Sequence, residues 1–506
     1  MALNLPMHLF QEPETSSNIV MLALLVILLY ILVHYSCISK NSNHPPSPPK
    51  IPIIGNLHQL GHFPHQSLRS LSLKHGPLML LQIGRIPTLV VSSPEMAEQV
   101  LRTQDHIFAN RPLVKIMDRL MYGQKNMSFS PYGEYWRQAK KVIILNLLSK
   151  KKVQSFQPIR DDEVTHLIRK ISSSPGLVNL SEILNDTTSK VVCRAILGKY
   201  LTKDKRGNDE FHDSLDKAME LLGEFHMEDF FPSLGWLGKF TGLDERVNEV
   251  SRVMDELSNS VIDDHLTRSI TEKPDFVDVL IGLQHDPNAD IKFSRDETKA
   301  IVMDLIGAGT DTSYITVEWA MAELVRNPEA MKKAQEEVRE IAGKKSMVEQ
   351  DDIKGMLYLK AVVKEILRLH PPTPLLLPKE LMEDTKLMGY NIPSKCRVIV
   401  NAWAIGRHPD YWERPDEFQP ERFLNSTIEY QGHDFQLIPF GAGRRICPGL
   451  AFAIATIELV LANLLHRFEW KLPGELRGVD LNMDEAHGIT IRRKQSLMLV
   501  AVPRSD

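Results

Sequence analysis

The chain has 506 residues, of which 43% are hydrophobic and 25% are charged. This is the composition of a globular protein, and it excludes a mainly disordered, collagen-like or coiled-coil chain. Lys and Arg number 60 against 64 Asp and Glu, so the net charge of −4 offers no basic stripe that would favour nucleic acid as a partner. The cysteines are Cys37, Cys193, Cys396 and Cys447, and their spacing supports neither a disulfide framework nor a structural zinc site.

Residues 1–40 have the pattern of an N-terminal membrane anchor. Residues 19–38 form an apolar stretch of the length that a helix needs to cross a hydrocarbon core of about 30 Å. A cleaved signal peptide is the alternative, but its apolar part usually follows basic residues, and here Glu12 and Glu14 precede the stretch. Positive charge follows at Lys40, which predicts that the chain beyond this single span lies in the cytosol.

The remainder of the chain is predicted to be a hinge and one large domain. Residues 41–60 are rich in proline, which favours a stiff, extended hinge. Residues 61–506 show mainly helical periodicity with no internal repeat and no further linker, so we predict a mainly helical catalytic domain with small β-sheets. Within it, residues 77–91 predict a β-hairpin, residues 328–341 a long helix and residues 396–403 a short buried strand.

The strongest chemical signal is the segment FGAGRRICPG at residues 440–449, which precedes an apolar helix. Glycines on both sides of Cys447 allow the backbone to turn sharply and to approach a ligand closely. The positive end of the following helix and the side chain of Arg445 both favour a thiolate at this position. A thiolate here is either a nucleophile or a metal ligand, and the segment contains no histidine that could serve a nucleophile as its base.

This segment resembles the haem-binding loop of the cytochromes P450, F-x-x-G-x-R-x-C-x-G, which the chain matches at Phe440, Gly443, Arg445, Cys447 and Gly449. The resemblance implies a single large cytochrome P450 fold, mainly α with small β-sheets, in which haem b lies between a long central helix and the helix after the cysteine. It implies that Cys447 is the axial thiolate that holds the iron and increases its electron density. It also implies that Phe440 and Gly441 lie beside the cofactor.

A second motif, AGTDTS at residues 308–313, lies inside an apolar stretch. Glycine inside a helix costs about 1 kcal/mol relative to alanine, so Gly307 and Gly309 need a compensating role. We expect them to loosen the helix and to let a flat cofactor approach its backbone. By the resemblance, Asp311 and Thr312 form the acid–alcohol pair that passes protons during oxygen activation; the alternative is a buried helix with a capping threonine.

Three further residues are expected to hold the fold together. Glu365 and Arg368 lie three residues apart on one helix face and can pair. The resemblance implies that Arg422, in the sequence PERF, completes a buried network with them. Such a network stabilises a protein only if every polar group in it is satisfied. An ordinary surface ion pair is the alternative for Glu365 and Arg368 alone.

The resemblance also assigns residues to the haem propionates. Trp136 and Lys140 match the family pattern W-x-x-x-R except that lysine replaces arginine, which keeps the charge but loses the bidentate fork. Arg111, Lys379 and Arg445 are the other cations expected at the propionates. For each basic residue, a solvated surface charge is the alternative.

The residues that we expect on the wall of the substrate pocket, again by resemblance, are Val302, Ala308, Leu375, Leu376 and Ile489. Their apolar or small side chains fit a hydrophobic substrate such as a terpenoid or a phenolic, although core packing is the alternative interpretation of Leu375 and Leu376. Residues 229–237 are expected either to dip into the membrane beside a substrate entrance or to form a buried loop.

No glycine-rich flavin or nicotinamide site follows a predicted strand, so the electrons must come from another protein. The resemblance implies NADPH–cytochrome P450 reductase, through which NADPH acts indirectly, with cytochrome b5 as a second candidate donor. We expect an acidic face of the reductase to dock on a basic surface formed by Arg137, Lys140, Lys141, Arg444 and the run Lys150–Lys152.

The order of the motifs resembles the A-type (71 clan) plant microsomal members of this family. The resemblance implies a single-pass enzyme of the endoplasmic reticulum membrane that inserts one atom of O₂ into a small lipophilic specialised metabolite. Two alternatives stay open: a haem-thiolate isomerase or dehydratase that needs no reductase, and a non-catalytic haem-binding scaffold in a membrane complex. The intact pair of Asp311 and Thr312 weighs against both.

Overall fold

The structure is a computed structural model, and it describes residues 21–22, 25–26, 43–174, 176–198, 205–224, 226–233, 235, 242–268 and 274–504. The predicted membrane span at residues 19–38 therefore lies almost wholly outside the described residues. Within them, one helix is long and apolar enough to cross a membrane, α17 (Leu450–Arg467), and 78% of it is buried inside the protein. This burial makes α17 a core helix.

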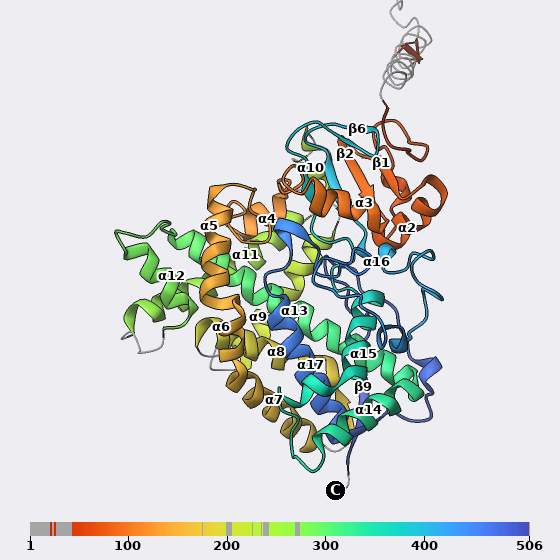
Figure 1. Cartoon of the computed structure of the whole chain (residues 1–506). Helices are drawn as coiled ribbons and strands as arrows, with labels where there is room; N and C mark the ends of the chain where they lie inside the picture. Colours follow the sequence, from red (N-terminus) through yellow and green to blue (C-terminus); the bar gives the residue numbers. More distant parts are fainter. Residues whose placement is uncertain are drawn as a thin grey trace, which may run out of the picture.

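Helices dominate the described chain (Figure 1). The α-helices are α2 (Pro64–His75), α3 (Pro94–Glu98), α4 (Lys115–Leu120), α5 (Glu134–Ile143), α6 (Lys150–Ser155), α7 (Gln157–Ser172), α8 (Leu180–Leu197), α9 (Lys205–Gly223), α10 (Met227–Phe230), α11 (Leu243–Thr267), α12 (Phe276–His285), α13 (Arg295–Arg326), α14 (Pro328–Ala342), α15 (Leu357–Leu369), α16 (Ala402–Ile405) and α17. The π-helical turns η2 (Gln99–Thr103) and η3 (Ile144–Leu148) extend α3 and α5, and the 3₁₀ turn η7 (Gly443–Arg445) precedes Cys447. The helix predicted at residues 328–341 is confirmed as α14, which begins with proline directly after Asn327.

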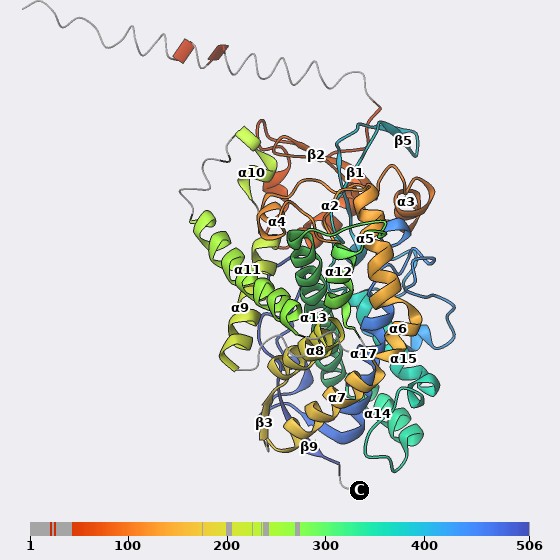
Figure 2. The same ribbon diagram turned by 90° about the vertical axis from the view of Figure 1, so that its left-hand side faces the viewer.

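Three small sheets complete the fold. The strands are β1 (Leu78–Ile83), β2 (Ile86–Val91), β3 (Gly176–Asn179), β4 (Lys379–Glu380), β5 (Thr385–Leu387), β6 (Tyr390–Ile392), β7 (Arg397–Val400), β8 (Phe468–Lys471) and β9 (Met498–Pro503). They pair in the orders β1-β2-β7-β4, β3-β9-β8 and β5-β6, and only β2 and β7 are parallel. The first two sheets lie at opposite ends of the helical body (Figures 1 and 2).

The sheet residues test two predictions. The hairpin predicted at residues 77–91 is confirmed, since Leu78 pairs with Val91 across the antiparallel strands β1 and β2. The strand predicted at residues 396–403 is shorter than expected and ends at Val400. The chain turns there because the side chain of Asn401 accepts a hydrogen bond from the Ala404 amide at 3.0 Å and caps the helical turn α16.

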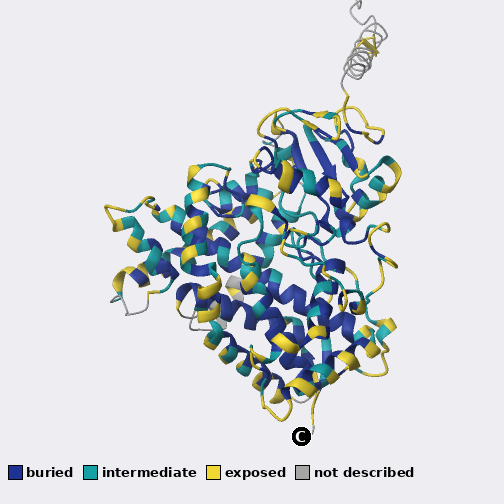
Figure 3. Ribbon diagram, viewed as in Figure 1, coloured by how far each residue is buried: buried dark blue, intermediate teal, exposed yellow. Residues whose placement is uncertain are grey.

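The long helix α13 runs through the centre of the molecule and packs against α8, α15 and α17 (Figure 2). Its 32 residues begin with a capping box, in which Ser294 and Glu297 bond to each other's backbone amides. Almost every residue from Thr298 to Leu324 is buried (Figure 3). This burial agrees with its apolar sequence and makes α13 a rigid wall on which a site can be built.

The glycines of α13 do not loosen the helix, contrary to our expectation. The helix is continuous from Arg295 to Arg326. A Cβ atom on Gly307 would lie 3.0 Å from Cδ1 of Leu215, and one on Gly309 would lie 3.1 Å from Cγ2 of Val192. The compensating role of the glycines is therefore close packing of α9 and α8 against α13.

The described part of the proline-rich segment is attached to the body. The Asn43 amide donates to the Gly389 carbonyl at 2.8 Å, and the His44 imidazole contacts the Asn391 carbonyl at 2.8 Å. These bonds join the segment to the β5–β6 hairpin. Of residues 229–237, Asp229 accepts from the Lys115 amide at 2.9 Å and Phe231 is buried, but Pro232 and Ser233 are exposed, so both interpretations of this segment stay predictions; residues 234, 236 and 237 lie outside the described residues.

Candidate active site

A cavity of about 310 Å³ lies between α13 and the segment that contains Cys447. Of the predicted wall residues, Ala308, Leu376 and Ile489 line it. Ala308 is exposed in an otherwise buried stretch of α13, because its methyl group faces the open cavity. The apolar lining fits a lipophilic ligand.

Two of the predicted wall residues do not line this cavity, and our assignment of them is corrected. Val302 is 2% exposed and packs in a hydrophobic core cluster. Leu375 packs against the small core beneath β1. Neighbouring side chains on the same elements, Met303 and Leu377, face the cavity instead.

Cys447 lies in the cavity wall, and its position is fixed by the backbone around it. Its amide donates to the Phe440 carbonyl at 3.0 Å. Burial raises the pKa of the Cys447 thiol, whereas the N–H groups of Gly449 and Leu450 at the start of α17 lower it by hydrogen bonding to the sulfur. The helix end thus acts on the sulfur as predicted, but Arg445 makes other contacts, described below.

Gly443 is required by the same loop. Its φ of +69° is left-handed, and an added Cβ would lie 1.9 Å from the Leu101 carbonyl oxygen. No other residue type fits this turn without displacing the backbone of η2. Phe440 and Gly441 line the cavity, as expected.

Three cations gather at the polar side of the cavity: Arg111 and Lys379 are buried, and Arg445 is partly buried. Burial and the neighbouring Arg111 lower the pKa of Arg445 to about 8, and burial lowers the pKa of Arg111 to about 10. Burial, Arg111 and Arg445 also lower the pKa of Lys379 well below its usual value. Burial is the largest cause of all three pKa shifts, and no ion pair within the described chain offsets it.

The partners of the two arginines, Arg111 and Arg445, are backbone carbonyls. Arg445 donates to Ala109 at 2.9 Å and Ser130 at 2.7 Å, while its second terminal nitrogen is buried without a partner. Arg445 also stacks on the indole of Trp136, 4.1 Å from the ring centre. A buried guanidinium with an unused donor favours an anionic partner from outside the chain.

Trp136 and Lys140 are placed differently from our expectation. The indole N–H of Trp136 donates to the Met127 carbonyl at 3.2 Å, so a protein acceptor already uses it. Lys140 is half-buried, and its ammonium group donates to the Arg444 carbonyl at 2.5 Å. Trp136 lines the cavity and packs beneath Arg445, whereas Lys140 lies at the edge of the Cys447 loop.

The donor set fits a haem. The cavity offers a thiol that accepts two backbone N–H bonds, apolar walls, and three cations, of which Arg445 has a buried and unused N–H group. A haem needs an axial ligand, apolar contacts for its ring and positive charge for its two propionates. All three requirements are met by residues on one cavity.

Asp311 and Thr312 both line the cavity, but they have different hydrogen-bond partners. The Thr312 hydroxyl donates to the Ala308 carbonyl at 2.8 Å, four residues earlier on α13. The Asp311 carboxylate accepts a bond from the hydroxyl of Thr490. Burial raises the pKa of Asp311 to about 6, while Thr490 and Arg492 oppose the shift. Thr490 lines the cavity, as the resemblance implied for residues 488–490, but its bond to Asp311 was not predicted.

The raised pKa of Asp311 gives a prediction for stability. Between its ordinary pKa of 3.8 and its folded value of about 6, the folded protein holds a proton that the unfolded chain has lost. Stability from this group is therefore present below pH 3.8 and is lost as pH rises through 6, at a cost of about 3 kcal/mol. Asp311→Asn should remove this loss, so its advantage over the wild type in the free energy of unfolding should grow from pH 4 to pH 7. Parallel denaturant titrations at both pH values measure it, and an equal difference at both would contradict the prediction.

Glu365, Arg368 and Arg422 form one buried network. Arg368 binds both carboxylate oxygens of Glu365, each at 2.7 Å, and neither side chain is exposed. Arg422 donates to Glu365 at 3.1 Å, and so does the Gln419 amide at 2.8 Å. The remaining Arg368 donors bond to the carbonyls of Gly406, Pro415 and Glu417. This network joins α15 to the chain before the Cys447 loop and lies away from the cavity.

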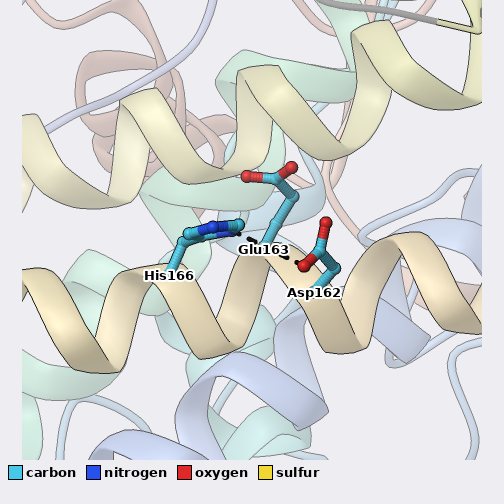
Figure 4. Close-up of side chains that lie close together, drawn as sticks. All are labelled: Asp162, Glu163 and His166. Carbon is cyan, nitrogen blue, oxygen red and sulfur yellow. Dashed lines mark ion pairs between the residues drawn. The ribbon is translucent and has the colours of Figure 1, made fainter.

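A separate cluster on the surface does not form a second site. Asp162, Glu163 and His166 lie together on α7 (Figure 4), close enough to hold a metal ion. Arg194 of α8 binds both carboxylates, so the closeness of the two acids is explained without an ion.

The fold and this cavity define a mainly helical protein built to hold haem through a cysteine. The chain belongs to the cytochrome P450 family, whose sequence profile matches residues 45–499. Cytochrome P450 71A9 of Glycine max is 51% identical over 464 residues, covering 91% of this chain and 93% of the relative. Strychnine-11-hydroxylase of Strychnos nux-vomica is 46% identical over 463 residues, which is 91% of each chain.

A solved zebrafish cytochrome P450 structure with progesterone has the same fold, with a TM-score of 0.76 at 26% identity, covering 87% of this chain and 99% of that one. The predicted fold class and the resemblance to plant 71-type members are thereby confirmed. The chain is a cytochrome P450 monooxygenase, and its fold implies a haem iron with a cysteine thiolate ligand.

Proposed function

We propose that this monooxygenase oxidises a small lipophilic plant specialised metabolite of the terpenoid or phenolic class, with electrons from NADPH–cytochrome P450 reductase. The observation that supports the proposal is that Cys447, Ala308 and Thr312 line the same, mainly apolar cavity. The relatives support it, since one is named as a hydroxylase of strychnine and the zebrafish structure contains a steroid. Strychnine and progesterone are both compact, polycyclic, largely apolar molecules.

In this proposal Cys447 holds the haem iron, and Arg111, Lys379 and Arg445 hold the propionates. The bound haem supplies the oxygen-activating chemistry. The remaining steps belong to the chain: the apolar wall around Leu376 and Ile489 excludes water and orients the substrate. Thr312 lines the cavity, and the adjacent residue Asp311, bonded to Thr490, holds a titratable proton.

The anchor and the partners follow the family. Residues 1–40 would anchor the protein in the endoplasmic reticulum membrane with residues 61–506 in the cytosol. The bonds from Asn43 and His44 to the β5–β6 hairpin would fix how the catalytic domain stands on the bilayer. Cytochrome b5 is a second electron donor in this scheme.

The first experiment is the carbon monoxide difference spectrum of the reduced protein in microsomes. A strongly red-shifted Soret band is expected from a thiolate-ligated haem. Polycyclic terpenoids and phenolics are then screened with reductase and NADPH, against hydrophilic glycosides of the same compounds as the control. Oxidation of the free compounds alone supports the proposal; conversion of a compound without reductase would assign an isomerase or dehydratase instead.

The reductase is expected to dock on the basic surface that includes Lys150, Lys151 and Lys152. All three are exposed and form no ion pair within the described chain, whereas Arg137, Lys141 and Arg444 are paired with acids. Charge reversal of the three lysines should therefore raise the KM of this enzyme for the reductase and make that KM less dependent on ionic strength. Charge reversal at Lys332, an exposed lysine of α14 outside this surface, is the matched control. An unchanged KM for the triple variant would contradict this docking site.

A further inference from the structure

Asp304 is a buried carboxylate on the cavity wall that has no part in the proposed chemistry. It lies on α13, one helical turn before Ala308, and is 8% exposed. An acid in an apolar cavity is costly unless its oxygens are well bonded. Its partners therefore indicate what it does.

All of its partners belong to the loop between α4 and α5, residues 121–133. One oxygen accepts from the Asn126 amide at 2.9 Å. The other accepts from both the backbone N–H and the hydroxyl of Ser128, each at 3.0 Å. Three donors from one loop thus converge on a single side chain of the central helix.

This loop has a conformation that needs external support. Tyr122 and Gln124 have φ values of 51° and 54°, in the left-handed region that is unfavourable for residues other than glycine. Met121, Met127 and Phe129 of the same loop line the cavity. The position of the loop therefore sets the shape of one cavity wall.

Arg111 holds the same loop from the other side. Its Nε donates to the Ser128 carbonyl at 2.9 Å, and one of its terminal nitrogens donates to the Leu377 and Pro378 carbonyls, both at 2.7 Å. The residue Ser128 is thus bound through its N–H to Asp304 and through its C=O to Arg111. The two charged groups and the loop form one connected unit between α13 and β4.

We propose that Asp304 is a positioning residue that fixes the 121–133 loop against α13 and thereby determines which substrates the cavity accepts. It acts through Asn126 and Ser128 rather than by contact with the substrate. The proposal rests on the proposed function only in taking this cavity as the substrate site.

Hydrogen exchange measured by mass spectrometry on the haem-loaded enzyme tests the proposal. Asp304→Asn replaces the carboxylate by an amide, whose NH₂ group cannot accept the two bonds from Ser128. Peptides covering residues 121–133 should therefore exchange about tenfold faster. Glu318→Gln is the matched control, because Glu318 is an equally buried acid of α13 that bonds to Ser181 outside the cavity. It should leave this loop unchanged.

A binding measurement on the same variants separates positioning from direct contact. Clotrimazole, a neutral azole, should bind Asp304→Asn about tenfold more weakly by its spectral shift, in step with the faster loop exchange. Weaker azole binding with normal loop exchange would mean that Asp304 touches the ligand, and unchanged loop exchange in any case overturns the proposal. If Asp304→Asn does not fold, Ser128→Ala, which removes one of the three bonds, should show a smaller change in the same peptides. An absent carbon monoxide band in the wild type would refute the proposed function; loop exchange, then measured on the full chain as purified, would still report on Asp304.

Discussion

Replacement of Cys447 by serine should abolish the red-shifted carbon monoxide band and reduce NADPH-dependent oxidation to background. A serine hydroxyl does not ionise near neutral pH, so it cannot replace a thiolate as an electron-donating ligand. Size is nearly conserved, and the Gly449 and Leu450 amides that face the sulfur stay in place. The loss is therefore chemical rather than structural. Reduced difference spectra and turnover, each normalised to folded protein, measure it.

The other described cysteines provide the controls. Cys193 and Cys396 are buried in the core and neither lines the cavity. Serine at either position should lower stability but leave the position of the carbon monoxide band unchanged. A red-shifted band that survives in Cys447→Ser would show that another group holds the iron.

Arg368→Ala should have the largest effect on stability. It removes the guanidinium that bonds to the Glu365 carboxylate and to three backbone carbonyls. The buried Glu365 carboxylate is then left with only Arg422 and the Gln419 amide as donors. Breaking a buried ion pair by removing one partner costs about 3–5 kcal/mol, a large part of the stability of most proteins. Urea unfolding followed by circular dichroism is expected to show this loss, together with a low yield of haem-loaded protein.

An exposed ion pair provides the comparison with the buried Arg368 network. Arg252 and Glu256 are four residues apart on α11, and both are exposed. Arg252→Ala should change the free energy of unfolding by no more than about 1 kcal/mol. Arg368→Lys keeps the positive charge but loses the two-pronged contact with the Glu365 carboxylate, so its loss of unfolding free energy should lie between those of Arg368→Ala and Arg252→Ala. Equal stability of Arg368→Ala and Arg252→Ala would contradict the role of the buried network.

Local sequence signals predicted the elements whose causes are local. The β1–β2 hairpin and α14 were predicted because β-branched and apolar residues around Gly84 and an Asn-Pro helix start are signals contained within a few residues. The end of β7 was missed because it depends on one side-chain cap at Asn401. The glycines of α13 were misinterpreted because their reason lies in α8 and α9, which are distant in sequence.

The same distinction applies to the site. Two short and distinctive motifs, FGAGRRICPG and AGTDTS, predicted that Cys447, Asp311 and Thr312 share one cavity. Which neighbour on a helix faces the cavity was not predictable, so Met303 and Leu377 line it in place of Val302 and Leu375. The bond from Thr490 to Asp311 joins residues 179 positions apart, and no local pattern indicates it.

The three uncompensated cations beside the cavity also bear on how much of this enzyme a cell accumulates. Newly made chain that folds without its dianionic cofactor must bury Arg111, Lys379 and Arg445 against one another, a state that cofactor binding relieves by mass action. Chains waiting for haem therefore open more often and are exposed to proteases for longer. We therefore expect haem supply, and not transcription alone, to affect the steady-state abundance of the protein.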